Sequence, residues 1–224
     1  MVCGDAEVTI GSSIAARSSA PRQKHRDNLI FIAKSAPHFV TEGVNVARGS
    51  STRKLLSYDN LHEIPKQFRQ NKAIHRGAAC LTVYVDTIDR DGAPIDLIPL
   101  LRFISRLPKT ELHSACIFLD DRNGLGKIGP KKLGFLDHME YKHGVDFFTR
   151  ELGGRASHVK VLVAGSWYNA FGHQGGYVLG AADLIEYLTW DARAYFFSTP
   201  PMPLQTAMSE KALELLQEGY SPSF

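Results

Sequence analysis

The chain has 224 residues, of which 44% are hydrophobic and 22% charged, a composition typical of a globular protein with one sizeable core. Its formal net charge of +3 is too small to indicate nucleic-acid binding, so no nucleic-acid partner is expected. No apolar run approaches the roughly eighteen residues that a membrane span requires, and Met1–Ala20 lacks the pattern of a signal peptide. The isolated chain is therefore expected to be soluble and cytoplasmic.

Apolar runs of strand length recur along the chain. Most are continuous rather than alternating, which is typical of strands that are covered on both faces. The runs are Asn28–Ala33, Ala79–Val85, Ala115–Leu119, Val159–Ala164 and Tyr177–Leu179.

Segments of helical period lie between or after these runs. Asp96 is placed to cap a helix that carries apolar residues from Leu97 to Leu107 along one stripe, with Pro99 tolerated in the first turn. Ala182–Trp190 and Leu204–Glu218 also read as helices, and the second should end at Gly219. Strands that alternate with helices predict an α/β domain with a mostly parallel sheet, and ligands of such domains bind at the carboxyl ends of the strands.

The sequence carries only weak motifs for a nucleotide site, a metal site or a hydrolase site. Gly124–Gly129 fits the G-x-G-x-x-G pattern, but Pro130 and two lysines follow it, and no clear helix comes next for a pyrophosphate to cap. We therefore do not expect a nucleotide site. The histidines show no metal-ligand spacing, since His62-Glu63 lacks a second histidine, and no metal is expected. A G-x-S-x-G nucleophile turn is absent from the sequence.

A set of segments resembles, in the same order, the landmarks of the pyridoxal-phosphate-dependent α-oxoamine synthases. Taken alone, one of them, a strand that runs into Asp-Asp and Asn-Gly, could equally be an ordinary turn. The segments are Asp86–Leu97, Phe118–Gly129, Gly165–Gly176, Gly175–Gly180 and Ala194–Pro201. The resemblance runs from about Val8 to Gly219, and it implies an aminotransferase-like large domain with a mostly parallel central sheet covered by helices.

The resemblance assigns residues to a cofactor site. It places Asp120 at the aspartate that pairs with the pyridine nitrogen. Ser166 and Tyr168 fall at phosphate-binding positions, and Ser198 with Thr199 match a pair that the family contributes to the phosphate across the dimer interface.

Three positions depart from the family. Asn169 stands where the cofactor lysine should be, Asn123 replaces a histidine near the ring oxygen, and Pro37 replaces the stacking histidine, with His38 beside it. An amide cannot form a Schiff base, so no catalytic residue is expected in this chain, and its own binding of pyridoxal 5'-phosphate should be weak or absent. Neither Lys127 nor Lys160 stands at the lysine position.

One branch of this family shows a similar loss. The non-catalytic first long-chain-base subunits of serine palmitoyltransferase have E-N-A at the lysine loop, which is similar to Tyr168–Ala170. This resemblance implies a heterodimer in which a lysine-bearing catalytic subunit holds the cofactor and condenses L-serine with palmitoyl-CoA, the first step of sphingolipid biosynthesis. The complex would lie on the cytosolic face of the endoplasmic reticulum.

Two alternatives stay open. One is a stand-alone pyridoxal-phosphate-dependent enzyme that condenses an acyl-CoA with an amino acid, and the other is a catalytically dead interaction remnant. In either case the resemblance implies that residues 1–219 form a partial cofactor domain, that the C-terminal small domain is absent, and that residues 220–224 are a tail.

Overall fold

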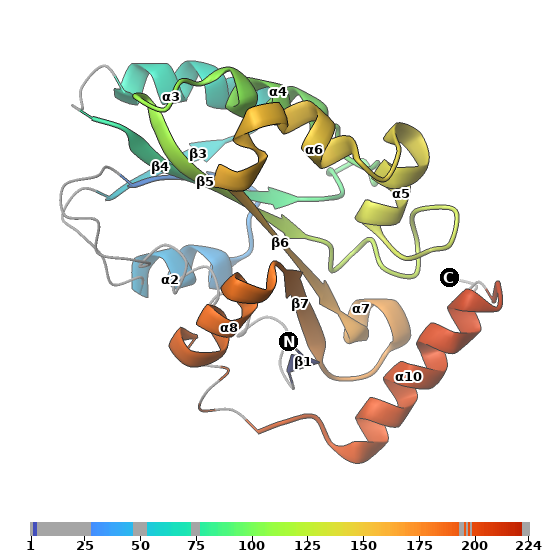
Figure 1. Cartoon of the computed structure of the whole chain (residues 1–224). Coiled ribbons are helices and arrows are strands. Elements are labelled where there is room, and N and C mark those ends of the chain that lie inside the picture. The colour runs from blue at the N-terminus through green and yellow to red at the C-terminus, as the bar shows by residue number, and fades with distance from the viewer. Residues whose placement is uncertain are drawn as a thin grey trace.

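Strands rich in β-branched and aliphatic residues form a sheet that is covered by helices on both faces (Figure 1). The computed structural model describes residues 2–3, 28–46, 53–72, 77–192, 195, 197 and 199–220. Within them the sheet has seven strands in the order β1-β7-β6-β5-β4-β2-β3. The strands are β1 (Val2–Cys3), β2 (Asn28–Ala33), β3 (Arg53–Tyr58), β4 (Ala79–Asp86), β5 (Leu112–Asp120), β6 (Val159–Ser166) and β7 (Gly176–Gly180).

The strands from β2 to β6 run parallel, and β7 is antiparallel to both β6 and β1. The carboxyl ends of β2, β4, β5 and β6 therefore meet at one edge of the sheet. The predicted strands are confirmed, and the parallel sheet is the one that their continuous apolar runs indicate.

Alternate residues of the central strands enter two different cores. In β5, Ile117 and Leu119 join the core beneath α3, α4 and α6, whereas Cys116 and Phe118 join the core beneath α2 and α8. This two-sided burial explains why the strand sequences are apolar without alternation. The helices are α2 (His38–Val46), α3 (Ile64–Lys72), α4 (Ile98–Arg106), α5 (Phe135–His143), α6 (Phe147–Leu152), α7 (Trp167–Phe171), α8 (Ala182–Asp191) and α10 (Pro203–Gln217).

The three predicted helices are present, with one correction at a helix start. The residue that caps α4 is Leu97 rather than Asp96, although the Asp96 carboxylate still accepts a hydrogen bond from Ile98 N at 3.0 Å. Gly219 follows α10 with φ +87°, a backbone conformation that suits glycine at the end of a helix.

The absence of a helix after the glycine-rich turn was a wrong prediction. The α5 helix begins at Phe135, but its first N–H is already bonded to Oδ2 of Asp121 at 2.8 Å. A helix is therefore present at this point, yet a buried side chain of the same protein occupies its amino end.

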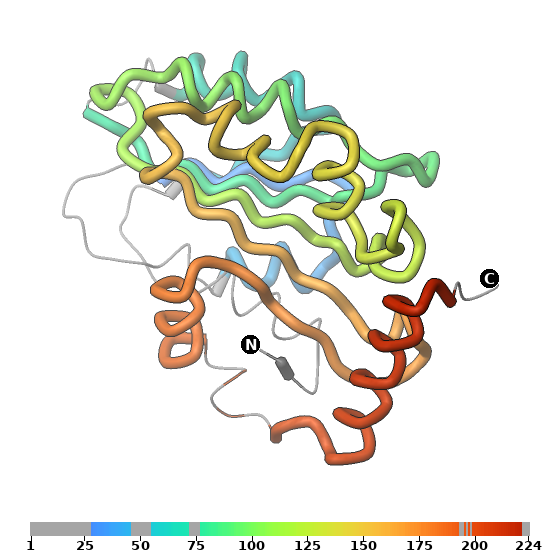
Figure 2. Tube along the Cα trace, turned by 45° about the vertical axis from the view of Figure 1, so that its right-hand side comes forward, coloured from blue at the N-terminus to red at the C-terminus, as the bar shows by residue number. Residues whose placement is uncertain are grey.

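Figure 2 shows α10 beside α7, which follows β6, and the two helices are in contact. Only Leu216 of α10 is buried, and Leu204 and Met208 are exposed on its surface. No helix in the described part of the chain is both long enough and apolar enough to span a bilayer.

Candidate functional site

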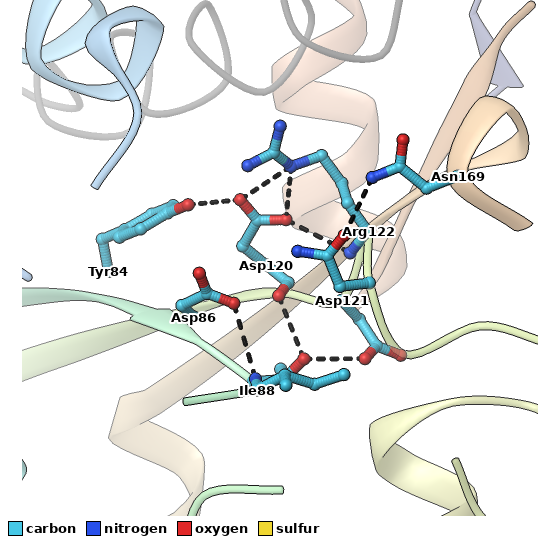
Figure 3. A network of polar contacts seen from close by, with 9 residues as sticks. Tyr84, Asp86, Ile88, Asp120, Asp121, Arg122 and Asn169 are labelled. Atoms are coloured by element: carbon cyan, nitrogen blue, oxygen red, sulfur yellow. Dashed lines mark hydrogen bonds and ion pairs between the residues drawn. The ribbon is translucent and has the colours of Figure 1, made fainter. Parts of the chain in front are cut away.

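A buried carboxylate, Asp120, ends β5 at the centre of the carboxyl edge of the sheet. Its side chain is only 1% exposed and forms an ion pair with the Arg122 guanidinium. Nε of Arg122 lies 2.7 Å from Oδ1 and 2.9 Å from Oδ2, and the Arg122 backbone N–H donates to Oδ1 at 3.2 Å. The Tyr84 hydroxyl donates to Oδ2 from the neighbouring strand β4. Figure 3 shows the carboxylate held between these two side chains.

The pairing of β4 with β5 explains this geometry. Tyr84 lies opposite Phe118 in register and stacks on its ring, and Asp86 lies opposite Asp120. Burial is the main reason that the pKa of the Tyr84 hydroxyl lies well above its ordinary value, and the neighbouring Asp120 carboxylate adds to the effect. Tyr84 therefore stays protonated and donates its hydrogen bond.

Helix α2 covers the other side of the Arg122 guanidinium. The carbon of the guanidinium lies 4.6 Å from the centre of the Phe39 ring, a cation–π contact. His38 does not face the site, because its side chain is 87% exposed and lies 3.6 Å from Glu42 on the same helix. Pro37 precedes the helix, and its carbonyl accepts from Val40 N at 3.0 Å. Neither Pro37 nor His38 therefore supplies the stacking side chain that family members have.

The two loops that sequence reasoning compared lie side by side at this edge. Asn169, in α7, donates from its side-chain amide to the side-chain oxygen of Asn123 at 3.0 Å. A Cβ at Gly126 would lie 3.6 Å from the Ala170 carbonyl oxygen, so the loop backbones are in close contact. The two residues that the resemblance predicts at the lysine and histidine positions are therefore bonded to each other.

A second buried carboxylate, Asp121, organises the turn that follows. Oδ1 accepts from the Thr87 hydroxyl at 2.8 Å, and Oδ2 accepts from Phe135 N at 2.8 Å. A Cβ at Gly124 or Gly134 would lie 1.9 Å or 2.1 Å from these carboxylate oxygens, so both positions need glycine. Burial raises the pKa of Asp121 to about 7, although its two hydrogen bonds oppose the rise.

A cleft of about 900 Å³ opens beside this network, between the ends of β2, β3 and β4 and the turn after β5. Asp86, Asn123 and Lys127 line it together with the acidic turn 89–91. Burial raises the pKa of Asp86 to about 6, and the charge on Asp120 contributes to the same rise. In the described part of the chain, no group of three histidine, cysteine, aspartate or glutamate side chains could hold a metal ion.

The remaining predicted residues are dispersed. Ser166 is buried at the end of β6, whereas the Tyr168 side chain is 70% exposed. Thr199 is exposed in the segment before α10, and Ser198 lies outside the described residues. The structure therefore bonds Asn123 to Asn169, and Asp120 to Arg122 and Tyr84, at the same edge of the sheet. Among the described residues, no hydrogen bond links Tyr168 or Thr199 to either group.

The two other lysines considered in the sequence lie at different places relative to the site. Lys160 lies near the opposite end of β6 and pairs with Asp183 at 2.8 Å. Six residues of extended strand separate Lys160 from Ser166, a distance of roughly 20 Å at about 3.3 Å per residue. Lys127 is closer because it lines the same cleft as Asn123.

Sequence reasoning missed the residues that complete the network: Tyr84, Asp86, Asp121, Arg122 and Phe39. Arg122 was the easiest of them to identify from the sequence. It stands only two positions after the aspartate assigned to the site, and it replaces the alanine of D-E-A-H. Tyr84 carried a weaker signal, namely a polar hydroxyl within the apolar run of a central strand.

No protein-family profile matches the chain. Among curated proteins, the chain is 36% identical over 225 residues to aminotransferase ALT4 of Alternaria alternata, which covers 98% of this chain and 27% of that protein. It is 37% identical over 196 residues to aminotransferase FUM8 of Gibberella moniliformis, with coverage of 86% and 35%. It is 26% identical over 217 residues to the 8-amino-7-oxononanoate synthase of Fervidobacterium nodosum, with coverage of 96% and 49%. The chain thus spans less than half the length of each of these relatives.

Solved structures share the fold. The serine palmitoyltransferase of Sphingomonas wittichii superposes with a TM-score of 0.67 at 16% identity, over 96% of this chain and 46% of that one. An 8-amino-7-oxononanoate synthase from Francisella tularensis gives a TM-score of 0.58 at 16% identity, over 98% and 52%. A structure described as serine palmitoyltransferase with its cofactor gives 0.70 at 13% identity, over 98% and 47%. The described sheet and helices are therefore those of the pyridoxal-phosphate-dependent transferase fold.

Proposed function

The chain belongs to the α-oxoamine synthase family, and from that premise we propose that it is a lysine-less chain that supports a catalytic partner in condensing an acyl-CoA with an amino acid. The partner carries the lysine and the cofactor. The resemblance to serine palmitoyltransferase subunits favours L-serine and palmitoyl-CoA as the substrates. On this proposal the complex acts in sphingolipid synthesis at the endoplasmic reticulum.

One observation carries the proposal: the residue at the lysine position is Asn169, and its amide is bonded to Asn123. Family chemistry begins with a lysine amine that forms a covalent bond to the cofactor and moves a proton, and an amide does neither. The surrounding residues do not fit the cofactor either, because Arg122 and Tyr84 already hold the Asp120 carboxylate. We therefore assign no chemical step to this chain.

Exposure of Thr199 supports a contribution to the partner's site rather than a site of its own. In the family the matching threonine contacts the cofactor phosphate across the dimer interface. Thr199 is exposed, as a residue that contacts a partner chain must be in the isolated chain. The same exposure would be expected of an ordinary turn, so the test below depends on this residue.

The experiment is co-expression with the lysine-bearing chain encoded by the same genome, followed by purification through a tag on one chain. We expect a stable complex that releases CoA from palmitoyl-CoA when L-serine is added. Thr199→Ala should lower this activity about tenfold, as expected when a phosphate contact is lost. Thr206→Ala is the matched control, since Thr206 is an exposed threonine in α10 and should leave activity unchanged. Failure to isolate a complex would overturn the proposal.

A second candidate is a stand-alone condensing enzyme, and the position of Lys127 on the cleft beside Asn123 favours it. The curated relatives named aminotransferases and 8-amino-7-oxononanoate synthases are also compatible with it. Borohydride reduction of the purified chain with pyridoxal phosphate separates the two candidates. Stoichiometric labelling of Lys127 that Lys127→Ala abolishes would favour the stand-alone enzyme, whereas scattered labelling of surface lysines would not.

A further inference from the structure

Two residues already hold the Asp120 carboxylate with three hydrogen-bond donors. A carboxylate offers about four lone-pair sites, two on each oxygen. Oδ1 accepts from the backbone N–H of Arg122, Oδ2 accepts from the Tyr84 hydroxyl, and the single Nε–H of Arg122 is shared between the two oxygens. The side chain is also closed to solvent, at 1% exposure, so a donor from a ligand must first displace one of these residues to reach it.

Arg122 combines three properties at this position. Its guanidinium is planar, it carries a permanent positive charge, and it donates an N–H to the carboxylate. One side of it lies against the Phe39 ring at 4.6 Å, and the side chain as a whole is only 10% exposed. A protonated pyridine ring has the same three properties: it is a flat aromatic cation with one N–H directed at a carboxylate.

We propose that the Arg122 guanidinium takes the place of the cofactor's protonated pyridine ring in this chain. The side chain supplies the positive charge that the buried Asp120 needs, and it fills the space against Phe39. The chain is thereby stable without pyridoxal phosphate and excludes its ring. The loss of the lysine and the presence of Arg122 are two separate barriers, one to covalent attachment and one to non-covalent binding.

This inference rests on the assignment of Asp120 within the family, and not on the partner complex. Its failure can therefore be told apart from failure of the proposed function. A chain without a catalytic partner could still carry Arg122 in the ring's place, and a supporting subunit could still bind cofactor if Arg122 swung away.

The direct test uses pyridoxamine 5'-phosphate, which has the pyridine ring and the phosphate but no aldehyde to react with surface lysines. We expect the purified chain to show no saturable binding by calorimetry, and Arg122→Ala to bind at least tenfold more tightly. Adding Asp120→Asn to that variant should remove the gain. The matched control is Arg102→Ala, which breaks another arginine–carboxylate pair at 2.7 Å, with Glu151, on the surface. That control should bind as weakly as the parent chain.

Two results would overturn the inference. One is binding of pyridoxamine phosphate by the unaltered chain as tightly as by Arg122→Ala, and the other is a folded Arg122→Ala variant that gains no affinity. If the Arg122→Ala variant does not fold, an NMR titration of the unaltered chain tests the inference instead. The Nε–H resonance of Arg122, assigned through its contact with Phe39, should not move when millimolar pyridoxamine phosphate is added. Displacement of that resonance on saturation would contradict the proposal.

Discussion

The side-chain amide of Asn169 donates to the side-chain oxygen of Asn123 at 3.0 Å, so α7 is joined to the turn after β5 by two residues that stand where family members have a lysine and a histidine. Asn123 is exposed and Asn169 is partly buried. The bond is therefore expected to contribute only modestly to stability, since water competes for both groups.

A double-mutant cycle measures this contribution. Asn123→Ala and Asn169→Ala should each lower the free energy of unfolding by about 0.5 to 1 kcal/mol, with a coupling energy of about 0.5 kcal/mol between them. Urea denaturation followed by circular dichroism gives all four values. A coupling energy above about 2 kcal/mol would contradict this expectation, because it would mean that the bond between the two side chains is a major contribution to stability.

Arg122→Ala should cost far more, because it leaves the Asp120 charge buried without its cationic partner. Breaking a buried pair by removing one member typically costs about 3 to 5 kcal/mol. The double variant with Asp120→Asn should recover part of that loss, because the unpaired charge is then gone. Arg102→Ala removes a side chain that is 58% exposed and should cost about 1 kcal/mol or less. Equal losses at Arg122 and Arg102 would show that burial is not what matters here.

Gly134 tests the role of Asp121 in the turn. A Cβ there would lie 2.1 Å from Oδ2 of Asp121, at φ +94°, so Gly134→Ala meets both a clash and backbone strain. Gly92→Ala is the matched control, because Gly92 has φ +82° with no atom within 4 Å of the added Cβ. We expect the first variant to be less stable than the second by about 2 kcal/mol in thermal or urea unfolding. Similar losses of stability in the two variants would mean that the Asp121 side chain moves aside for the added Cβ at little cost.

The stability contribution of Asp121 should depend on pH. Its pKa in the folded chain is raised to about 7 by burial, so folding favours the protonated carboxyl. That contribution is complete below about pH 4 and is lost as the pH rises through about 7. Asp86, with a pKa of about 6, acts in the same direction. His138 acts in the opposite direction, because its pKa is lowered by burial.

The difference between the parent chain and Asp121→Asn isolates this residue, because Asp86 and His138 are common to both. The stability of the parent relative to the variant should fall by about 2.6 kcal/mol between pH 5 and pH 8, at about 1.4 kcal/mol per unit until the pH reaches about 7. A difference that stays constant over this range would place the pKa of Asp121 in the folded chain below about 5.

The sequence predicted the buried elements better than the exposed ones. Asn28–Ala33 coincides with β2 because each of its central residues enters a core, which makes the run continuously apolar. Strand β3, Arg53–Tyr58, was not predicted, since an edge strand pairs on one side and its R-K-L-L-S-Y sequence has no clear period. Helix α3 was missed because its apolar contacts come mainly from Ile64 and Phe68, four residues apart in a polar segment.

The site was predictable in its location but not in its contacts. The order of the landmarks placed Asp120, Asn123 and Asn169 at one edge of the sheet, and the structure brings them together there. The pairing of Asp120 with Arg122 and Phe39 could not be predicted, because it depends on the rotamer of a long side chain and on a helix that the sequence did not indicate. Thr199 is exposed in the segment before α10, and Ser198 lies outside the described residues, so their predicted contact with a partner stays a prediction.

The central claim is that this chain holds no cofactor and supports a site on its partner. The most direct measurement is the content of pyridoxal phosphate in the purified complex, together with mass mapping of the lysine labelled by borohydride. The account predicts one cofactor for each pair of chains, attached only to the partner. Two cofactors for each pair, or a stoichiometric label on any lysine of this chain, would contradict it.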